Sequence, residues 1–564
     1  MAGPAREVAE AVSAPDPGIT QRAGVTAARP GRPARWARGR WAAGFIAAAI
    51  ALFTAYVRLS ATYPVNSDGA NIVLMSWDML HGNLLLHAWW MSDVSFYTTE
   101  LPEYMLIDAI RGLGPDVTHI AAALTYTLVL VLTVLLARSR ATARDGAVRV
   151  LIAGVIMLAP QLGVGIFVLL LSVGHIGTAA PVLAVWLILD RAPRRWYVPV
   201  IAGGVLAWTM VADSLVLVTA IVPLVLVSLF RAIPRLRSAW YELSLAIAAL
   251  AAAGVSWLAQ QAIHAAGGYT LHPVPFRLVA PAALGVHAAT AGDSLLALFG
   301  ANFGGLHSSV SIGPVSIGPV SVAFAVLHLV GLALAAWALG RTLRRFASRE
   351  LIDQVLAAAI VVNLAMYLFS TFSSGVLNGR EIALVLPFGA ALAARSLAPL
   401  AGRALAGRAL AGRALAGAVL AGAVLAGYVA GLGYELAQPV SPPANARLAS
   451  WLQAHHLTHG LSGYWQASVV TVGTGGRVTI RAVTTGGGKI VPYRWESNPA
   501  WYAPGTQYAS FVVLQNQPGF FTEWSPGPEV RATFGAPAQT FHTGPYTVLV
   551  WKQNLLAALS RPAP

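Results

Sequence analysis

Asp68 is the ionisable residue of this sequence best placed to do chemistry. It lies in the run Asn66-Ser67-Asp68-Gly69, just after the first hydrophobic stretch and at the start of a polar loop. A carboxylate there could take a proton from a hydroxyl group as a general base. Because Asp68 also directly precedes a predicted helix, a helix N-cap or a solvated loop residue is the alternative interpretation.

Arg380 could supply the positive charge that complements such a base. It lies in Asn378-Gly379-Arg380-Glu381, in one of the gaps between hydrophobic stretches that hold almost no other arginine. A guanidinium meets a phosphate through two parallel hydrogen bonds, so Arg380 is a candidate for binding a phosphate group. A lipid-headgroup anchor and an ion pair with Glu381 are the alternatives.

Three further residues are candidates for binding a substrate. Asp213 follows a hydrophobic stretch, and acids at membrane boundaries are often functional, although an exposed turn residue fits equally well. His175, in a tight turn between two glycines, could hydrogen-bond a sugar or a phosphate, or could be an ordinary interface histidine. Asp78 shares the polar loop with Asp68.

The elements that must position these residues are membrane spans. Hydrophobic residues make up 57% of the chain and charged residues only 10%, against roughly 25% charged in soluble domains. Stretches of about 20 apolar residues, long enough to cross a hydrocarbon core of ~30 Å, recur along the chain. We place about eleven of them, at 41–59, 118–137, 150–171, 178–190, 196–212, 214–230, 241–263, 319–340, 351–372, 382–399 and 414–433. The sequence therefore predicts a polytopic α-helical membrane protein.

The net charge of +15 is distributed as in a membrane protein, which argues against a nucleic-acid partner. Arginines gather in alternate gaps between the spans, which is the positive-inside pattern. The pattern puts the N-terminus in the cytoplasm and, with eleven spans, the C-terminus outside. The preference for arginine over lysine fits a GC-rich bacterial genome, so we expect the bacterial plasma membrane as the location.

The chain divides into three parts. Residues 1–40 are rich in Ala, Pro, Gly and Arg and are expected to form a disordered cytoplasmic tail. Residues 41–433 hold the spans, with long outer loops at 61–117 and 264–318. Residues 434–564 have soluble patterning and are expected to form a small outer α/β domain. Because the chain has no cysteine, this domain must be stabilised by packing without disulfides.

Local patterns predict several elements around the candidate residues. Two helices are expected in the first outer loop, at 70–81 and 102–110. In the C-terminal domain, Arg447 to His456 fits a helix, and 511–514 and 546–551 fit strands. Two more strands are expected at 468–472 and 477–483, joined as a hairpin by Gly473 to Gly476.

Residues 40–400 resemble the GT-C class of polytopic membrane glycosyltransferases, of an actinobacterial type. The matching features are the first span, the early loop acid Asp68 and a following helix that ends near Gly82. A segment from Leu101-Pro102 through Gly114 to the second span also matches, as does Arg380 at the start of a late span.

The resemblance implies transfer of a hexose or pentose from a polyprenyl-phosphate donor to a glycan, lipid or protein acceptor of the cell envelope, with inversion. It implies a catalytic role for Asp68 and a donor-phosphate contact for Arg380. Many members carry two adjacent acids in the first loop, whereas Gly69 stands at the second position here. Asp213 and Asp78 are candidates for the missing acid. We do not predict a metal, and the use of any cofactor stays open.

Two other functions remain as alternatives. A transporter or flippase of lipid-linked glycans would favour ionisable residues buried in mid-span and broken helices at paired positions, whereas the acids here gather at outer ends. A non-catalytic scaffold that presents the C-terminal domain predicts that Asp68 can be replaced without effect. No Walker loop, dinucleotide fingerprint, zinc spacing or nucleophile elbow occurs in a convincing context.

Overall fold

The computed structural model describes residues 32–141, 143–171, 174–272, 274–302, 319–406, 411–517 and 524–559. The chain divides into two compact units, residues 1–50 and 51–564, and all the contacts below lie within the second unit. Helix α1 (Arg32–Ser60) begins inside the segment that we expected to be disordered, and residues 1–31 of that segment lie outside the described residues.

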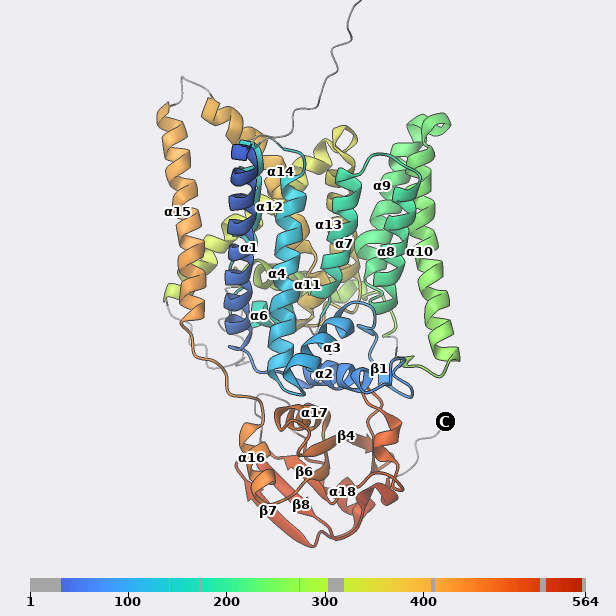
Figure 1. Ribbon diagram of the computed structural model, residues 1–564. Coiled ribbons are helices and arrows are strands. Elements are labelled where there is room, and N and C mark those ends of the chain that lie inside the picture. The colour runs from blue at the N-terminus through green and yellow to red at the C-terminus, as the bar shows by residue number, and fades with distance from the viewer. Residues whose placement is uncertain are drawn as a thin grey trace, which may run out of the picture. The chain divides into compact units, whose positions relative to one another are not determined.

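Apolar helices form the bundle in Figure 1. Within the described residues, six helical stretches are long and apolar enough to cross a membrane, and one bent pair would make a seventh. The six are Ala43–Ser60 of α1, α4 (Asp116–Arg138), α10 (Trp240–Ala265), Pro281–Phe299, Val322–Arg344 of α12 (Pro319–Arg344) and α13 (Leu351–Phe369). The bent pair is η6 (Val376–Ile382) with the first part of α14 (Val385–Ala406). The chain is therefore a polytopic membrane protein.

The remaining predicted spans correspond to helices outside these six, and all of them except α15 are shorter. They are α5 (Ala143–Met157), α6 (Val164–Leu170), α7 (Ile176–Arg191), α8 (Tyr197–Ala212), the π-helical turn η1 (Leu217–Ile221) with α9 (Val222–Ala232), and α15 (Ala411–Leu436). The predicted span 150–171 is broken between α5 and α6. Pro160 and Gly163, which has a positive φ of 77°, lie at the break.

The second predicted outer loop, 264–318, contains a helix that we did not expect. Helix α11 (Leu284–Phe299) packs against α13, α6 and η6, and with the preceding turn it forms the stretch Pro281–Phe299. Only the C-terminal end of α11 is buried against these elements, at Ser294, Ala297, Leu298 and Phe299, and most of its apolar surface is exposed. Residues 303–318 of this loop lie outside the described residues.

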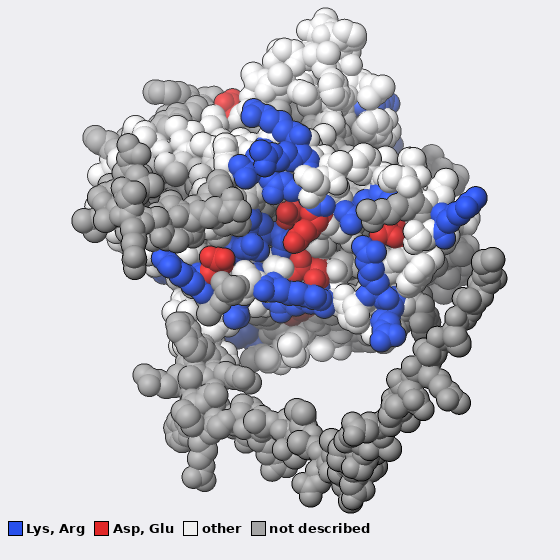
Figure 2. Space-filling model, turned by 90° about the horizontal axis from the view of Figure 1, so that it is seen from above, with Lys and Arg blue, Asp and Glu red and all other residues white. Residues whose placement is uncertain are grey.

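Arginines mark the end of the bundle that lies away from the C-terminal domain. Figure 2 shows lysine and arginine side chains gathered on this face, around a few acids. Some of the arginines join neighbouring connections: Arg140 donates to the carbonyl oxygen of Arg191, and Arg231 donates to that of Arg349. This is the distribution that the positive-inside rule associates with a cytoplasmic face.

Arg395 of α14 joins the end of α7 to the start of α13 inside the bundle. Its guanidinium lies 3.1 Å from Asp190 of α7, and 2.8 and 2.6 Å from Glu350 and Asp353 at the start of α13. The Arg395 side chain is almost fully buried, whereas Glu350 is largely exposed. Arg395 is therefore the cation in direct contact with the buried carboxylates of Asp190 and Asp353.

We expect Arg395→Met to lower the stability of the bundle by about 3 to 5 kcal/mol, because it removes the cation that contacts the buried carboxylates directly. The apparent melting temperature of the purified protein in detergent measures the effect. Arg344→Met, an exposed arginine on α12, is the matched control and should melt like the wild type. Equal melting of the Arg395 variant and the control would show that the cluster does not stabilise the fold.

The two helices predicted in the first loop are confirmed. Helices α2 (Ser67–Leu80) and α3 (Glu100–Arg111) lie across the ends of the bundle helices, beside the C-terminal domain (Figure 1). Asn66 is the N-cap of α2, and its side chain accepts a hydrogen bond from the backbone N–H of Gly69 at 3.0 Å. Asp68 is inside the helix, so the alternative that it caps α2 is wrong.

The C-terminal domain is a small α/β domain, as predicted. Its six-stranded sheet has the order β5-β4-β3-β6-β8-β7, in which β3 runs parallel to β4 and β6 and the other neighbours are antiparallel. The strands are β3 (His459–Ser462), β4 (Thr479–Gly486), β5 (Lys489–Pro492), β6 (Phe511–Gln515), β7 (Gln539–Thr543) and β8 (Tyr546–Val550). The helices are α16 (Ala446–Ala454), α17 (Tyr464–Gly473) and α18 (Gly527–Phe534).

One local prediction in this domain is wrong. Residues 468–472, expected to form a strand, are the buried middle of α17, which packs against β4 and against α2 of the first loop. Packing on both sides outweighs the β-propensity of these β-branched residues. The expected hairpin is instead the connection from α17 to β4, where Gly475 and Gly476 adopt positive φ.

The C-terminal domain is docked on the first loop. Trp90 and Ser497 exchange two backbone hydrogen bonds, of 2.8 and 3.0 Å. The ring of Trp89 meets that of Trp501 edge-on at 4.9 Å, and the guanidinium of Arg494 lies over the Trp90 ring. The two parts therefore share an interface, and the candidate site lies where they meet.

Candidate active site

A polar cavity of about 260 Å³ lies between the first loop, the turn before α7, η6 and the C-terminal domain. Four acids and two basic residues line it: Asp68, Asp93, Glu381, Glu496, Arg380 and His175. Aromatic side chains of the C-terminal domain, among them Tyr464 and Trp465, form another part of its wall. A concave site with a few converging charged groups is the usual form of a site for a polar ligand.

Asp68 reaches the cavity from the first turn of α2. Its Oδ1 lies 2.7 Å from the hydroxyl of Tyr464, and Asn66 donates a hydrogen bond of 3.3 Å to its Oδ2. The side chain keeps about a fifth of its surface exposed, at 18%. Asp68 lies in the first turn of α2, at the helix end where the backbone N–H groups point.

Arg380 lies beside Asp68. Its Nη1 is 4.0 Å from Oδ2 of Asp68, and its Nε is 4.0 Å from Oε1 of Glu381. The turn before α7 can approach Arg380 closely because residue 174 is glycine: a Cβ there would lie 2.9 Å from the Cβ of Arg380. Both ion pairs of Arg380 are long and its side chain is 34% exposed, so the guanidinium can still bind an anion.

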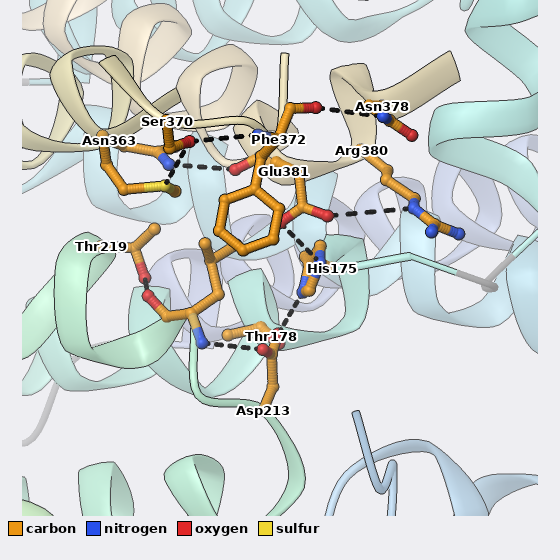
Figure 3. Close-up of polar contacts among 12 residues, drawn as sticks. His175, Thr178, Asp213, Thr219, Asn363, Ser370, Phe372, Asn378, Arg380 and Glu381 are labelled. Atoms are coloured by element: carbon orange, nitrogen blue, oxygen red, sulfur yellow. Dashed lines mark hydrogen bonds and ion pairs between the residues drawn. The ribbon is translucent and has the colours of Figure 1, made fainter. Parts of the chain in front are cut away.

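His175, Asp213 and Glu381 form one buried cluster next to the cavity (Figure 3). Nδ1 of His175 lies 2.8 Å from Asp213, and Nε2 lies 3.1 Å from Glu381. Asp213 also accepts hydrogen bonds from Thr178 and from the backbone of Leu215. Burial lowers the pKa of His175, but the two facing carboxylates outweigh it and raise that pKa well above its ordinary value.

This cluster changes the interpretation of two predicted residues. Asp213 is 2% exposed, so it is not a turn residue in solvent, and it holds one ring nitrogen of His175. With both nitrogens occupied by carboxylates, His175 is a buried cation that orders α7, the segment after α8 and η6 around the cavity wall.

We expect His175→Gln to lower the apparent stability by about 3 kcal/mol, because it removes the cation between two buried acids. The stabilisation by His175 is complete below its ordinary pKa of 6.5 and is lost as the pH rises through the raised folded-state value. Melting temperatures of the wild type and the variant, measured from below pH 6.5 upward, test the loss of stability and its dependence on pH. His455→Gln, at the exposed histidine directly after α16, is the control. A variant that melts like the wild type at pH 6 would contradict the assignment.

Asp78 does not reach the cavity. Its Oδ2 accepts hydrogen bonds of 2.7 Å from Nε1 of Trp89 and from Nδ2 of Asn83, just after the end of α2. Asp78 therefore holds the turn that follows the helix, and the structure does not bring it to Asp68. The acids that share the cavity with Asp68 are Asp93, Glu381 and Glu496.

Sequence reasoning missed Tyr464, Glu496 and Asp93. The Tyr464 hydroxyl lies between Asp68 and Glu496, at 2.7 and 2.6 Å. Burial and the charge of Asp68 raise the pKa of Glu496 to about 8, and burial also raises the pKa of Asp93. The sequence signal near Glu496 is a density of aromatic residues, Tyr493, Trp495, Trp501 and Tyr502, which fits a domain core as well as a binding surface. Among the described residues, no three His, Asp or Glu side chains are grouped as metal ligands.

Comparisons with known proteins give structural likenesses alone. No protein-family model matches the chain, and no curated protein sequence matches it either. One similar solved structure is ArnT from Cupriavidus metallidurans bound to undecaprenyl phosphate, with a TM-score of 0.47, 14% identity, and coverage of 93% of this chain and 99% of that one. Another is the Archaeoglobus fulgidus oligosaccharyltransferase tethered to an acceptor peptide, with a TM-score of 0.42, 13% identity, and coverage of 82% and 68%. Both TM-scores are too low for the likeness to identify a fold family or an activity.

Proposed function

We propose that this chain is an inverting membrane glycosyltransferase of the GT-C type. It transfers a hexose or pentose from a polyprenyl-phosphate donor to a glycan, lipid or protein acceptor at the outer face of a bacterial plasma membrane. The observation that carries the proposal is the pairing of Asp68 with Arg380, 4.0 Å apart at the wall of one polar cavity. In this proposal the chain crosses the membrane about eleven times, with a cytoplasmic N-terminus and an outer C-terminal domain.

The location of the cavity supports a lipid-linked donor. It lies at the end of the bundle where α2 and α3 cross the other helices, opposite the arginine-rich face (Figures 1 and 2). A sugar on a polyprenyl phosphate is tethered to the membrane by its leaving group, so its reactive carbon stays near the membrane surface. Arg380, in η6 just before the bundle helix α14, is where a phosphate at that surface could be bound.

The two side chains divide the chemistry of transfer. The acceptor oxygen forms a bond to the anomeric carbon while the bond from that carbon to the phosphate oxygen breaks. The acceptor proton passes to Asp68, and the departing polyprenyl phosphate keeps the electron pair, with its charge facing Arg380. Attack on the face opposite the leaving phosphate inverts the anomeric configuration.

A transporter of lipid-linked glycans is the second candidate, and two observations favour it. Arg395, Asp190 and Asp353 are ionisable groups buried in the bundle, and the broken pair α5–α6 resembles the interrupted helices that transporters use. A transporter would move the lipid between leaflets without breaking the bond between sugar and phosphate.

The test uses the purified protein in lipid nanodiscs, with a panel of synthetic polyprenyl-phosphate sugars and a cell-envelope extract as acceptor. Mass spectrometry follows the release of free polyprenyl phosphate. We expect release from at least one donor, dependent on the acceptor extract. Movement of intact lipid-linked sugar across vesicle membranes, with no release of polyprenyl phosphate, would instead establish the transporter.

A further inference from the structure

Tyr464 joins carboxyl groups from two distant parts of the chain. Its hydroxyl oxygen lies 2.7 Å from Oδ1 of Asp68 in α2 and 2.6 Å from Oε2 of Glu496 in the C-terminal domain. Nδ2 of Asn71 lies 3.2 Å from both the Tyr464 hydroxyl and Oε2 of Glu496. The Tyr464 carbonyl oxygen also accepts a hydrogen bond of 2.6 Å from Ser67. The position of the hydroxyl is therefore fixed by α2 as well as by its own domain.

The number of protons shared by the Tyr464 hydroxyl and the two carboxyl groups decides whether Asp68 and Glu496 are charged. A phenol hydroxyl has one proton and can donate it to only one of the two carboxyl groups. If both acids were ionised, one of the two short oxygen–oxygen contacts would contain no proton, and the two negative charges would repel. The contacts are satisfied when one carboxyl group is protonated and donates to Tyr464, which in turn donates to the other.

The surroundings of the two acids differ in a way that assigns the proton. Asp68 is at the N-terminal end of a helix, is partly exposed and has Arg380 at 4.0 Å. Glu496 is 4% exposed and has a positive φ of 45°, an uncommon backbone conformation for a residue other than glycine. Burial and the charge of Asp68 raise the pKa of Glu496 to about 8. The titratable and charged groups that act on Glu496 are Asp68 from α2, Arg380 from η6, and Tyr464 and Tyr493 from its own domain.

We propose that Glu496 is a positioning residue that stays protonated and, through Tyr464, directs a hydroxyl proton onto Asp68. This inference deepens the proposed transferase function and depends on it for its catalytic meaning. The Tyr464 proton then occupies Oδ1 of Asp68, and Oδ2, which accepts from Asn66 at 3.3 Å and lies 4.0 Å from Arg380, is the oxygen that takes the acceptor proton. The C-terminal domain supplies both Tyr464 and Glu496, so it completes the active site. When Glu496 loses its proton, the Tyr464 hydroxyl can donate to either of two carboxylates. The hydrogen bond that orients Asp68 is then no longer fixed.

The assignment can be tested without measuring activity, by infrared titration of the full-length protein in nanodiscs. A protonated carboxyl group has a C=O band separate from that of a carboxylate, and other buried acids contribute similar bands. The difference between wild type and Glu496→Gln therefore isolates the band of Glu496. We expect it to disappear near pH 8 in the wild type and to titrate at lower pH in Asp68→Asn, because the opposing charge is gone.

Glu529→Gln, in α18 of the same domain, is the control and should retain the whole band of the wild type. The proposal is overturned if Glu496→Gln leaves the protonated-carboxyl spectrum unchanged, or if Asp68→Asn does not move the titration.

Tyr464→Phe keeps the aromatic ring and removes the hydroxyl that joins Glu496 to Asp68. It should lower kcat about 10- to 100-fold, with a smaller change in the KM of the acceptor.

The pH profile of kcat separates this inference from the proposed function. In the wild type we expect kcat to fall above about pH 8, and in Glu496→Gln this alkaline fall should be absent because an amide does not ionise. Coincident profiles of the two proteins would overturn the positioning role. If the infrared titration follows Glu496 but no donor is cleaved, the proton assignment stands and the proposed function fails. If a donor is cleaved but the band does not depend on Glu496, the proposed function stands and the proton assignment fails.

Discussion

Asp68→Asn is expected to lower the rate of sugar transfer by a factor of about 100 to 10,000, the usual effect of removing a general base. Asparagine keeps the shape of the side chain and can still accept a hydrogen bond from Tyr464, but it cannot take the acceptor proton. The change should therefore appear in kcat for polyprenyl-phosphate release, with the melting temperature close to that of the wild type.

The control is Asp116→Asn, at the first residue of α4, directly after the same loop. Asp116 forms a surface ion pair with Arg111 and does not line the cavity. Such pairs contribute little to stability, so this variant should keep wild-type activity. Full activity of Asp68→Asn would contradict the assignment, and the scaffold or transporter function would then explain the protein better.

Arg380→Ala has the second largest expected effect, a loss of about 100- to 1,000-fold in kcat/KM for the donor, because a cation beside a departing phosphate stabilises the developing charge. Arg380→Lys should recover part of this loss, because lysine keeps the charge but not the paired hydrogen bonds. Steady-state kinetics with a purified donor measure both variants.

The matched control is Arg277→Ala, at an exposed arginine in the predicted second outer loop. It removes the same charge from a position outside the cavity and should leave donor kinetics unchanged. A donor kcat/KM in Arg380→Ala equal to that of the wild type would show that Arg380 pairs with Asp68 and Glu381 for structural reasons alone.

Much of the membrane architecture could be predicted because long apolar windows and arginine clusters are strong signals. The helices of the first loop were also predictable, from apolar periodicity and from the stop at Gly82-Asn83. Asp68 and Arg380 are far apart in the sequence, yet both were placed on the outer side, and the fold brings them to one cavity. The break at Pro160 and Gly163 carried a local signal that hydrophobicity alone obscured.

The contribution of the C-terminal domain could not be predicted, for a physical reason. Tyr464 reaches Asp68 because α17 packs against α2, and no local spacing in the sequence encodes that contact. The segment 468–472 shows the same limit, since its strand propensity is overridden by packing between α2 and β4. His175 and Asp213 were each proposed as separate substrate contacts, whereas the fold joins them in one buried cluster with Glu381.

The most direct test of the central claim is mass spectrometry of membrane lipids from a deletion strain. The strain is complemented with wild type, Asp68→Asn or Asp116→Asn, each at equal expression. Our account predicts that one polyprenyl-phosphate sugar accumulates in the deletion strain and with Asp68→Asn, but not with the other two proteins. A wild-type lipid profile with Asp68→Asn would contradict it.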